Sequence, residues 1–144
     1  MPTMSGMFSG TVTTQTAIGL PDDLSHALVM ATVSGTHQTD DPNWAGAKLT
    51  YYGMGDVWGG NGKQTGYFFN LHMNGDTTFG TFDAIATAVS IGGTQVEGSW
   101  QLQTGTGTLV GITGGGTFQA RSTSPVTVEM TWEGEYTLPE IEEG

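Results

Sequence analysis

Cysteine is missing from this chain of 144 residues, and positive charge is nearly missing. Without thiols, disulfide bonds, thiolate nucleophiles and cysteine-ligated metals are excluded. Three basic residues stand against 14 acidic ones, which gives a net charge of −11. Lys48, Lys63 and Arg121 cannot form the positive stripe that binds phosphate groups, so nucleic acid and anionic membranes are poor partners.

Long apolar runs are also missing near the N-terminus, and no positive charge precedes Lys48. A signal peptide needs a charged start and an apolar segment, and a transmembrane helix needs about 20 apolar residues. We therefore expect a cytoplasmic protein without a membrane-spanning helix.

Glycine is abundant, with 24 residues, and threonine is frequent, while only 36% of the residues are hydrophobic. This composition favours many short strands and turns over helix bundles. We expect one domain over residues 1–144, in which residues 139–144 form an acidic tail.

Strand-like segments follow one another with short turns between them. Three of them lie between residues 67 and 102, and the other five are 7–16, 26–37, 49–58, 117–122 and 126–138. Eight antiparallel strands predict an all-β, up-and-down barrel, whose closure removes exposed edges. A two-sheet sandwich is the alternative.

Two turn signals, Asn74-Gly75 and Gly92-Gly93, predict the register of the three strands around them. Two-residue hairpin loops at these positions would bring the partners of each strand onto shared faces. The predicted interior face carries Phe68, Asn70, His72, Phe79, Asp83, Ile85, Val89, Val96, Trp100 and Leu102.

The opposite face of the first two of these strands is also largely apolar. Its largest residues are Tyr67, Phe69, Leu71 and Phe82. An apolar outer face must be covered, so we expect a homo-oligomer, a dimer or a trimer, that forms through these four residues.

The facing of the strand over residues 49–58 stays open, because the following Gly59-Gly60-Asn61-Gly62 turn does not fix its own length. A three-residue loop would place Tyr52, Met54, Asp56 and Trp58 inside, and a two- or four-residue loop would place Tyr51 and Val57 there.

The stretch from Gly98 to Phe118 contains GTGTLVGITGGGTF and resembles the allene oxide cyclase-like barrel superfamily. The resemblance covers the C-terminal half, from about Tyr67, and is closest to a branch of uncharacterised bacterial proteins. It implies an eight-stranded, lipocalin-like barrel with an apolar cavity, often dimeric or trimeric. The known enzymes of the superfamily work without cofactors, chiefly by shaping a reactive substrate.

Asp83 is the sharpest catalytic candidate, because the predicted register buries its carboxylate, and burial raises a carboxyl pKa toward the range of a general acid or base. The alternative is a solvated position at the rim. His72 and Asn70 share the predicted face, where they could move protons or polarise a carbonyl, or could lie at the rim. The residues expected to bind the substrate are Phe68, Tyr52, Asp56, Trp58, Trp100, Ile85 and Met130.

Neither a metal nor another cofactor is expected. His26, His37 and His72 lack ligand spacing, and the glycine-rich stretch after Gly105 lacks a dinucleotide fingerprint. The leading hypothesis is therefore a cofactor-independent cyclase, isomerase or lyase that acts on a small, largely apolar molecule inside the barrel. The alternatives are a ligand-binding barrel without catalysis and a structural, oligomeric barrel with a filled core.

Overall fold

The computed structural model describes residues 3–89 and 93–139. Eight strands and one 3₁₀ helix follow one another along the chain. Their bounds are β1 Thr3–Gly19, β2 His26–Thr39, β3 Lys48–Trp58, β4 Asn61–Leu71, β5 Thr77–Ala88, β6 Thr94–Gly105, the 3₁₀ helix Gly107–Leu109, β7 Thr113–Ser124 and β8 Thr127–Thr137. Within the described residues no helix is long and apolar enough to cross a membrane.

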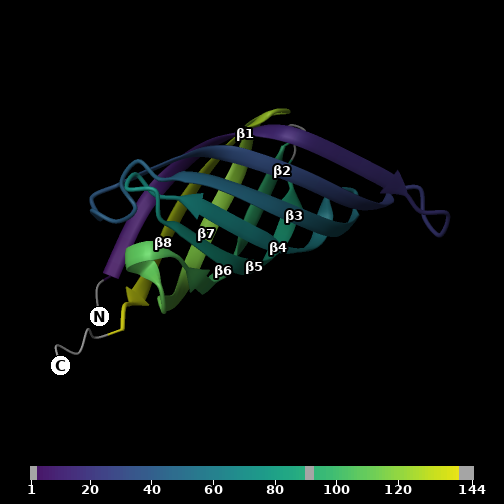
Figure 1. Ribbon diagram of the computed structural model, residues 1–144. Coiled ribbons are helices and arrows are strands. Elements are labelled where there is room, and N and C mark those ends of the chain that lie inside the picture. Colours follow the sequence, from purple (N-terminus) through teal and green to yellow (C-terminus); the bar gives the residue numbers. More distant parts are fainter. Residues whose placement is uncertain (1–2, 90–92, 140–144) are drawn as a thin grey trace, which may run out of the picture.

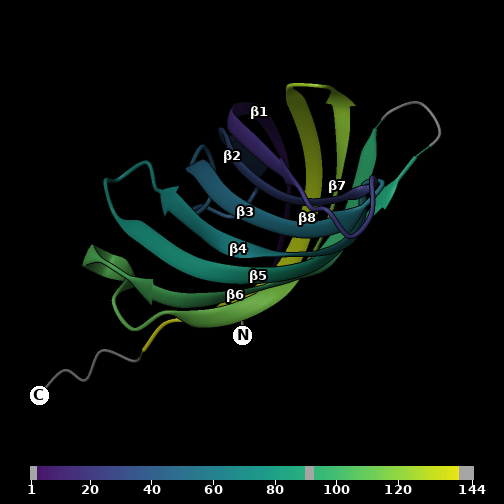
Figure 2. The same ribbon diagram turned by 90° about the vertical axis from the view of Figure 1, so that its right-hand side faces the viewer.

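Every strand pairs antiparallel with its neighbours in the sequence, and β8 pairs with β1 to close the sheet (Figure 1, Figure 2). The protein is therefore an all-β, eight-stranded, antiparallel up-and-down barrel, as the sequence predicts. Closure gives each of the eight strands two hydrogen-bonded neighbours, although β1 pairs with β8 over Thr3–Thr11 and its part beyond Val12 pairs with β2 alone.

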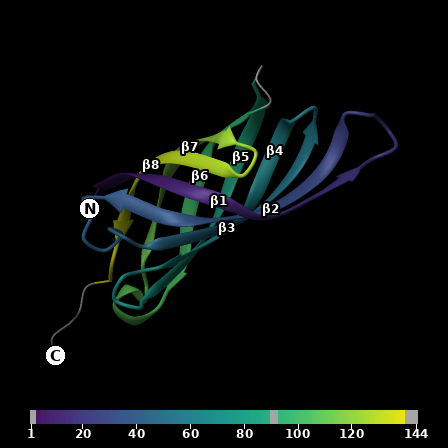
Figure 3. The ribbon, with the colours of Figure 1, turned by 90° about the horizontal axis from the view of Figure 1, so that it is seen from above.

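The two ends of the barrel differ. At one end, which we call the base, lie the loop 40–47, the 3₁₀ helix and both ends of the described chain. At the other end, which we call the mouth, the hairpin of β1 and β2 extends past the other strands (Figure 1, Figure 3).

Between β3 and β4 the turn has two residues, because Trp58 pairs with Asn61. Gly59 and Gly60 both have positive φ angles, 61° and 86°, which glycine adopts without the clash of a side chain. This loop length turns Tyr51 and Val57 inward. The prediction that Tyr52, Asp56 and Trp58 face the interior is therefore wrong.

In strand β5 the inward-facing and outward-facing side chains are exchanged relative to the prediction. Leu71 pairs with Thr77, and the backbone N–H of His72 donates to the carbonyl of Asp76, so three residues form this loop instead of two. A one-residue change of register moves every side chain of a strand to the other face. The prediction for Asp83 and Ile85 is thus wrong, because both lie on the outer surface and Phe82 lies inside.

Strand β6 nevertheless faces as predicted, because the register between β5 and β6 is also shifted by an odd number of residues, namely three. Ala88 pairs with Thr94, and Phe82 pairs with Trp100. The expected Gly92-Gly93 turn includes Gly92, which lies outside the described residues. The second shift compensates for the first, and so the error is confined to β5, including its predicted interior residue Phe79.

Buried side chains from loops close the base of the barrel. Trp44, from the loop 40–47, is 3% exposed, and its ring lies 4.9 Å from that of Tyr136 and 4.8 Å from that of His72. Leu109 of the 3₁₀ helix and the following Ile112 are each 2% exposed. These side chains seal one end of the barrel.

Candidate ligand cavity

A cavity of about 630 Å³ occupies the barrel between the mouth and the base. Its lining begins at the mouth with turn residues such as Ser25, Gly60 and Pro125, and it ends near the base at His37 and Trp44. The walls between them are mainly apolar: Val29, Val33, Leu49, Tyr51, Val57, Phe68, Phe82, Val96, Trp100, Leu102, Phe118, Val128, Met130 and Trp132. Both size and lining are typical of sites for small molecules.

Glycines opposite the aromatic rings help to keep this space open. A Cβ atom on Gly80 would lie 2.1 Å from the ring of Phe68, and one on Gly66 would lie 2.8 Å from the ring of Phe82. Each ring therefore lies against the backbone of the neighbouring strand instead of extending across the barrel. Glycine at both positions leaves the centre free of side chains.

A chain of buried polar groups, which we call the base network, links His37, Asn70, Thr78, His72 and the carbonyl of Asn43. His37 and Asn70 line the cavity, and His72 lies behind them. The four side chains are between 0% and 6% exposed. Buried polar groups at this depth need partners, and here they supply one another.

The direction of each hydrogen bond follows from the carbonyl oxygen of Asn43, which can only accept. The Nδ1 atom of His72, 2.6 Å away, therefore carries a hydrogen and donates it. Burial lowers the pKa of His72, so the ring is neutral near pH 7. Its Nε2 atom then accepts the hydroxyl of Thr78 at 2.9 Å.

The same order of hydrogen-bond donors and acceptors continues through Thr78 and Asn70 to His37. The Oγ1 atom of Thr78 accepts the side-chain N–H of Asn70 at 3.2 Å, and the amide oxygen of Asn70 accepts the Nε2–H of His37 at 2.8 Å. His37 thus carries its hydrogen on Nε2. Its Nδ1 atom is left as a bare acceptor.

Two buried side-chain nitrogen atoms have no hydrogen-bond partner within residues 3–89 and 93–139: Nδ1 of His37 and Nε1 of Trp132. Both residues line the cavity and are 6% exposed. Their ring centroids lie 5.1 Å apart in an edge-to-face arrangement. A hydrogen-bond donor and an acceptor are therefore both unused at the base end of an apolar cavity.

The protonation of the cavity residues points away from acid–base chemistry. Burial lowers the pKa of His37 to about 4, and burial raises the pKa of Tyr51 above its usual value, so both are neutral near pH 7. No aspartate or glutamate of the described chain lines the cavity.

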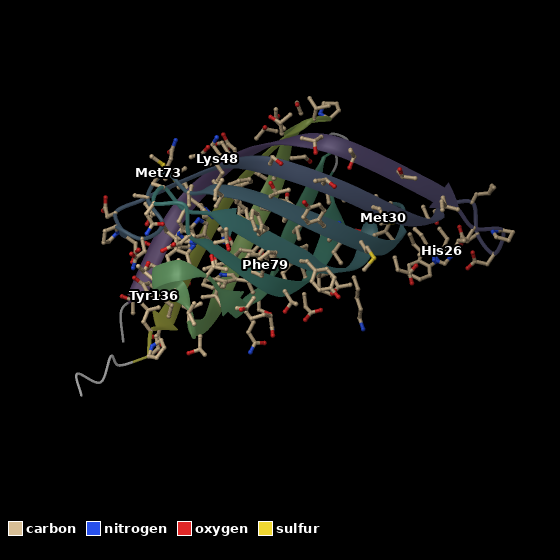
Figure 4. The ribbon with its side chains drawn as sticks, in the orientation of Figure 1. His26, Met30, Lys48, Met73, Phe79 and Tyr136 are labelled. Atoms are coloured by element: carbon tan, nitrogen blue, oxygen red, sulfur yellow. The ribbon has the colours of Figure 1, made fainter. Side chains whose placement is uncertain are left out.

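A third histidine lies at the mouth, at the start of β2 (Figure 4). Nδ1 of His26 lies 2.7 Å from the carboxylate of Asp22, Nε2 lies 2.5 Å from that of Asp56, and the ring stacks on Trp58 at 4.0 Å. Hydrogen bonds to Asp56 and then to Asp22 raise the pKa of His26. Asp56 and Trp58 thus form this mouth cluster on the outer surface, not the cavity wall.

Some of the predicted site residues come together and others do not. Phe68, Asn70, Trp100 and Met130 line the cavity, and His72 belongs to the base network. Their predicted roles in binding or catalysis stay predictions. The outward-facing residues are Tyr52, Asp56, Trp58, Asp83 and Ile85.

The catalytic role predicted for Asp83 depended on burial of its carboxylate inside the barrel, and Asp83 is not buried there. Its side chain is exposed and, with Thr81, Ser99 and Gln101, borders a depression of about 350 Å³ on the outer surface. A carboxylate on the outer surface does not face a ligand held inside the barrel.

The sequence prediction missed His37, Tyr51, Trp44 and Trp132 as neighbours at one site. The inward facing of His37 could have been predicted from the sequence. Val29, Ala31 and Val33 alternate on one face of β2, and the same period of two continues to residue 37. Trp44 lies in a loop, where no periodic pattern indicates facing.

The expected oligomer surface changes in part. Phe82 is 8% exposed and belongs to the core, whereas Tyr67 and Leu71 are 61% and 42% exposed. Phe69 packs on the outer surface against Phe79 at 4.7 Å. The homo-oligomer stays a prediction, now with Phe79 in place of Phe82.

In the described part of the chain, no three His, Asp or Glu side chains come together as metal ligands. Comparisons of the chain with models of protein families, with curated proteins and with solved structures find no match.

Proposed function

We propose that this protein binds a small, largely apolar molecule inside the barrel. The observation that carries the proposal is the cavity of about 630 Å³, which has an apolar wall and a lining that reaches from the turns of the mouth to His37. A core filled by side chains would leave no such space. Burial of apolar ligand surface, at about 25 cal/mol per Å², supplies the main driving force.

Binding without acid–base catalysis is favoured over the enzymatic hypothesis by the groups that face the ligand. A general acid or base works best with a pKa near the operating pH, and His37, with a pKa of about 4, is a weak base at pH 7. Asp83, the acid or base expected from the sequence, lies outside the barrel.

A cofactor-independent cyclase, isomerase or lyase is the second candidate, and the bare Nδ1 atom of His37 is the observation that favours it. Such an enzyme would act by holding a reactive substrate in a productive shape, with Asn70 and His37 as its polar contacts. This is the chemistry that the resemblance to the allene oxide cyclase-like superfamily implies. The superfamily assignment itself belongs to the proposal.

The binding proposal is tested with N-phenyl-1-naphthylamine, a neutral apolar dye whose fluorescence increases in apolar surroundings. Ala31 lines the cavity and pairs with Gly53, which leaves room for a larger side chain. Ala31→Trp should fill part of the cavity and abolish the fluorescence increase.

Met30, the next residue, points outward and is 59% exposed (Figure 4). Met30→Trp is therefore the matched control and should bind the dye like the unmodified protein. Equal binding by both variants would place the dye on the outer surface, and no binding by the unmodified protein would contradict the proposal directly.

A further inference from the structure

The two unpartnered atoms near the base indicate which polar group the ligand carries. This inference rests on the proposed binding function. Nδ1 of His37 is an acceptor without a donor, and Nε1–H of Trp132 is a donor without an acceptor. Each unmade hydrogen bond of this kind costs about 1–3 kcal/mol relative to the group in water. A ligand that satisfies both atoms recovers this free energy.

We propose that the cavity selects a neutral molecule that carries a hydroxyl group, an apolar alcohol or phenol, and binds it with the hydroxyl between His37 and Trp132. A hydroxyl is the smallest group that donates one hydrogen bond and accepts another at the same oxygen. Its hydrogen goes to Nδ1 of His37, and its oxygen accepts the indole hydrogen of Trp132. The two rings are in direct edge-to-face contact, with centroids 5.1 Å apart, so the hydroxyl would lie beside this contact and next to both residues.

The donor and acceptor roles at this site are fixed by the base network. The hydrogen on Nε2 of His37 is committed to Asn70, and Asn70 is held by Thr78, whose own hydrogen is committed to His72. The tautomer of His37 cannot reverse without breaking this sequence of bonds. A ligand must therefore donate to His37.

Other head groups fit less well. An ether or ketone oxygen can accept from Trp132 but leaves His37 without a donor. A carboxylate offers only acceptors and sets a negative charge in an apolar cavity, which is costly without a cationic partner. His37 does not supply that cation, because its pKa is about 4, and Arg121, which also lines the cavity, is largely exposed and pairs with Glu129.

The rest of the ligand extends toward the mouth along an apolar wall. Phe68 and Trp100 make an edge-to-face contact with ring centroids 6.2 Å apart, and Phe82 and Phe118 make another at 5.9 Å. Flat rings pack well against such aromatic faces. A bicyclic phenol is therefore a suitable probe.

The test compares two probes of nearly equal shape, 2-naphthol and 2-methylnaphthalene, by fluorescence or calorimetric titration at pH 7. The hydroxyl of the first is replaced by a methyl group in the second. The quantity of interest is the ratio of the two Kd values, measured in the unmodified protein and in Trp132→Phe. Loss of the indole N–H should reduce the preference for 2-naphthol by about tenfold.

Trp100→Phe is the matched comparison, because the indole N–H of Trp100 is already used by the carbonyl of Thr117 at 3.2 Å. This change alters the wall and so both affinities, but it should leave their ratio as it is in the unmodified protein. A ratio that falls equally in both variants would overturn the proposed role of Trp132.

The outcomes separate this inference from the proposed function. If both probes bind with a ratio that Trp132→Phe leaves unchanged, the hydroxyl site is wrong and the apolar cavity stands. If neither probe binds and the neutral dye does not bind, the proposed function fails as well.

A second readout does not need the variant to fold. In the ¹H–¹⁵N spectrum of the unmodified protein, the indole signal of Trp132 should move downfield with 2-naphthol and not with 2-methylnaphthalene. Equal shifts with both probes would contradict the inference.

Discussion

The base and the mouth of the barrel each hold a histidine, and the two side chains have opposite pKa shifts. His37, near the base, is surrounded by apolar side chains and neutral polar groups, and its pKa is lowered to about 4. His26, at the mouth, lies between the carboxylates of Asp22 and Asp56, and its pKa is raised. Both residues are nearly covered, at 6% and 8% exposure, but burial is the main cause of the shift of His37, whereas the hydrogen bonds to two carboxylates outweigh burial at His26.

This difference gives the two ends different tasks. The base is closed and neutral, which suits the recognition of an uncharged ligand group. The mouth is ionic and wet, because the carboxylates of Asp22 and Asp56 are more than half exposed. An ion pair so close to water adds little to stability. Four experiments test this difference between the two ends of the barrel.

The largest difference should come from removing one tryptophan at each end. Trp44→Ala deletes a side chain that is 3% exposed and seals the base, so it should lower the free energy of unfolding by about 3–5 kcal/mol. Trp58→Ala deletes one that is 44% exposed and should lower it by about 1 kcal/mol or less. Urea unfolding of both variants measures this, and equal losses would mean that the base is not the stabilising end.

The next effect is the pH dependence due to His37. Its pKa is about 4 when folded and about 6.5 when unfolded, so the unfolded state binds the proton first as the pH falls. Stability should decrease from pH 6.5 to pH 4, by on the order of 3 kcal/mol for this group. His37→Gln should flatten that part of the curve of unfolding free energy against pH, and an unchanged slope would contradict the assigned burial.

A smaller loss should follow from Asn70→Leu, which keeps the branched shape and the number of side-chain heavy atoms and removes both hydrogen bonds of the amide. Nε2–H of His37 would lose its acceptor, so we expect a cost of about 1–3 kcal/mol in urea unfolding. Asn61→Leu, at the exposed start of β4, is the control: its amide oxygen accepts the backbone N–H of Ala88 at 3.0 Å, but water can replace this bond, so the change should cost less. Equal costs would show that the base network contributes nothing specific.

The smallest effect is expected for His26. The raised pKa means that its ion pairs stabilise the fold fully below pH 6.5 and cease to do so as the pH rises through the folded pKa. In an NMR titration its ring signals should have a midpoint above 6.5, and 1 M salt should lower that midpoint. A midpoint below 6.5 would contradict the cluster with Asp22 and Asp56.

Much of the barrel was predictable from the sequence, because turn residues and alternating strands are local signals. Strand β8 shows this: Val128, Met130 and Trp132 alternate with Glu129, Thr131 and Glu133, and only one facing buries the apolar set. Strand β5 shows the limit. Phe79 and Ile85 on one face compete with Phe82 and its neighbouring alanines on the other, so the pattern alone did not decide the facing.

The candidate site was harder to predict because its parts come from distant strands and a loop. Loop length decided the facing of β5, and Asn74-Gly75 marked the position of its turn without fixing whether two or three residues form it. The pairing of His37 with Asn70 joins residues 33 positions apart, and the unpartnered indole of Trp132 becomes visible only when all neighbours are placed.

A crystal structure with bound 6-bromo-2-naphthol would show whether the ligand lies inside the barrel, because the anomalous signal of bromine locates it without ambiguity. We predict a bromine inside the barrel on the mouth side of His37, and the hydroxyl oxygen within hydrogen-bond distance of Nδ1 of His37 and Nε1 of Trp132. A bromine found only on the outer face around Tyr67 and Phe79, with the interior unoccupied, would contradict it.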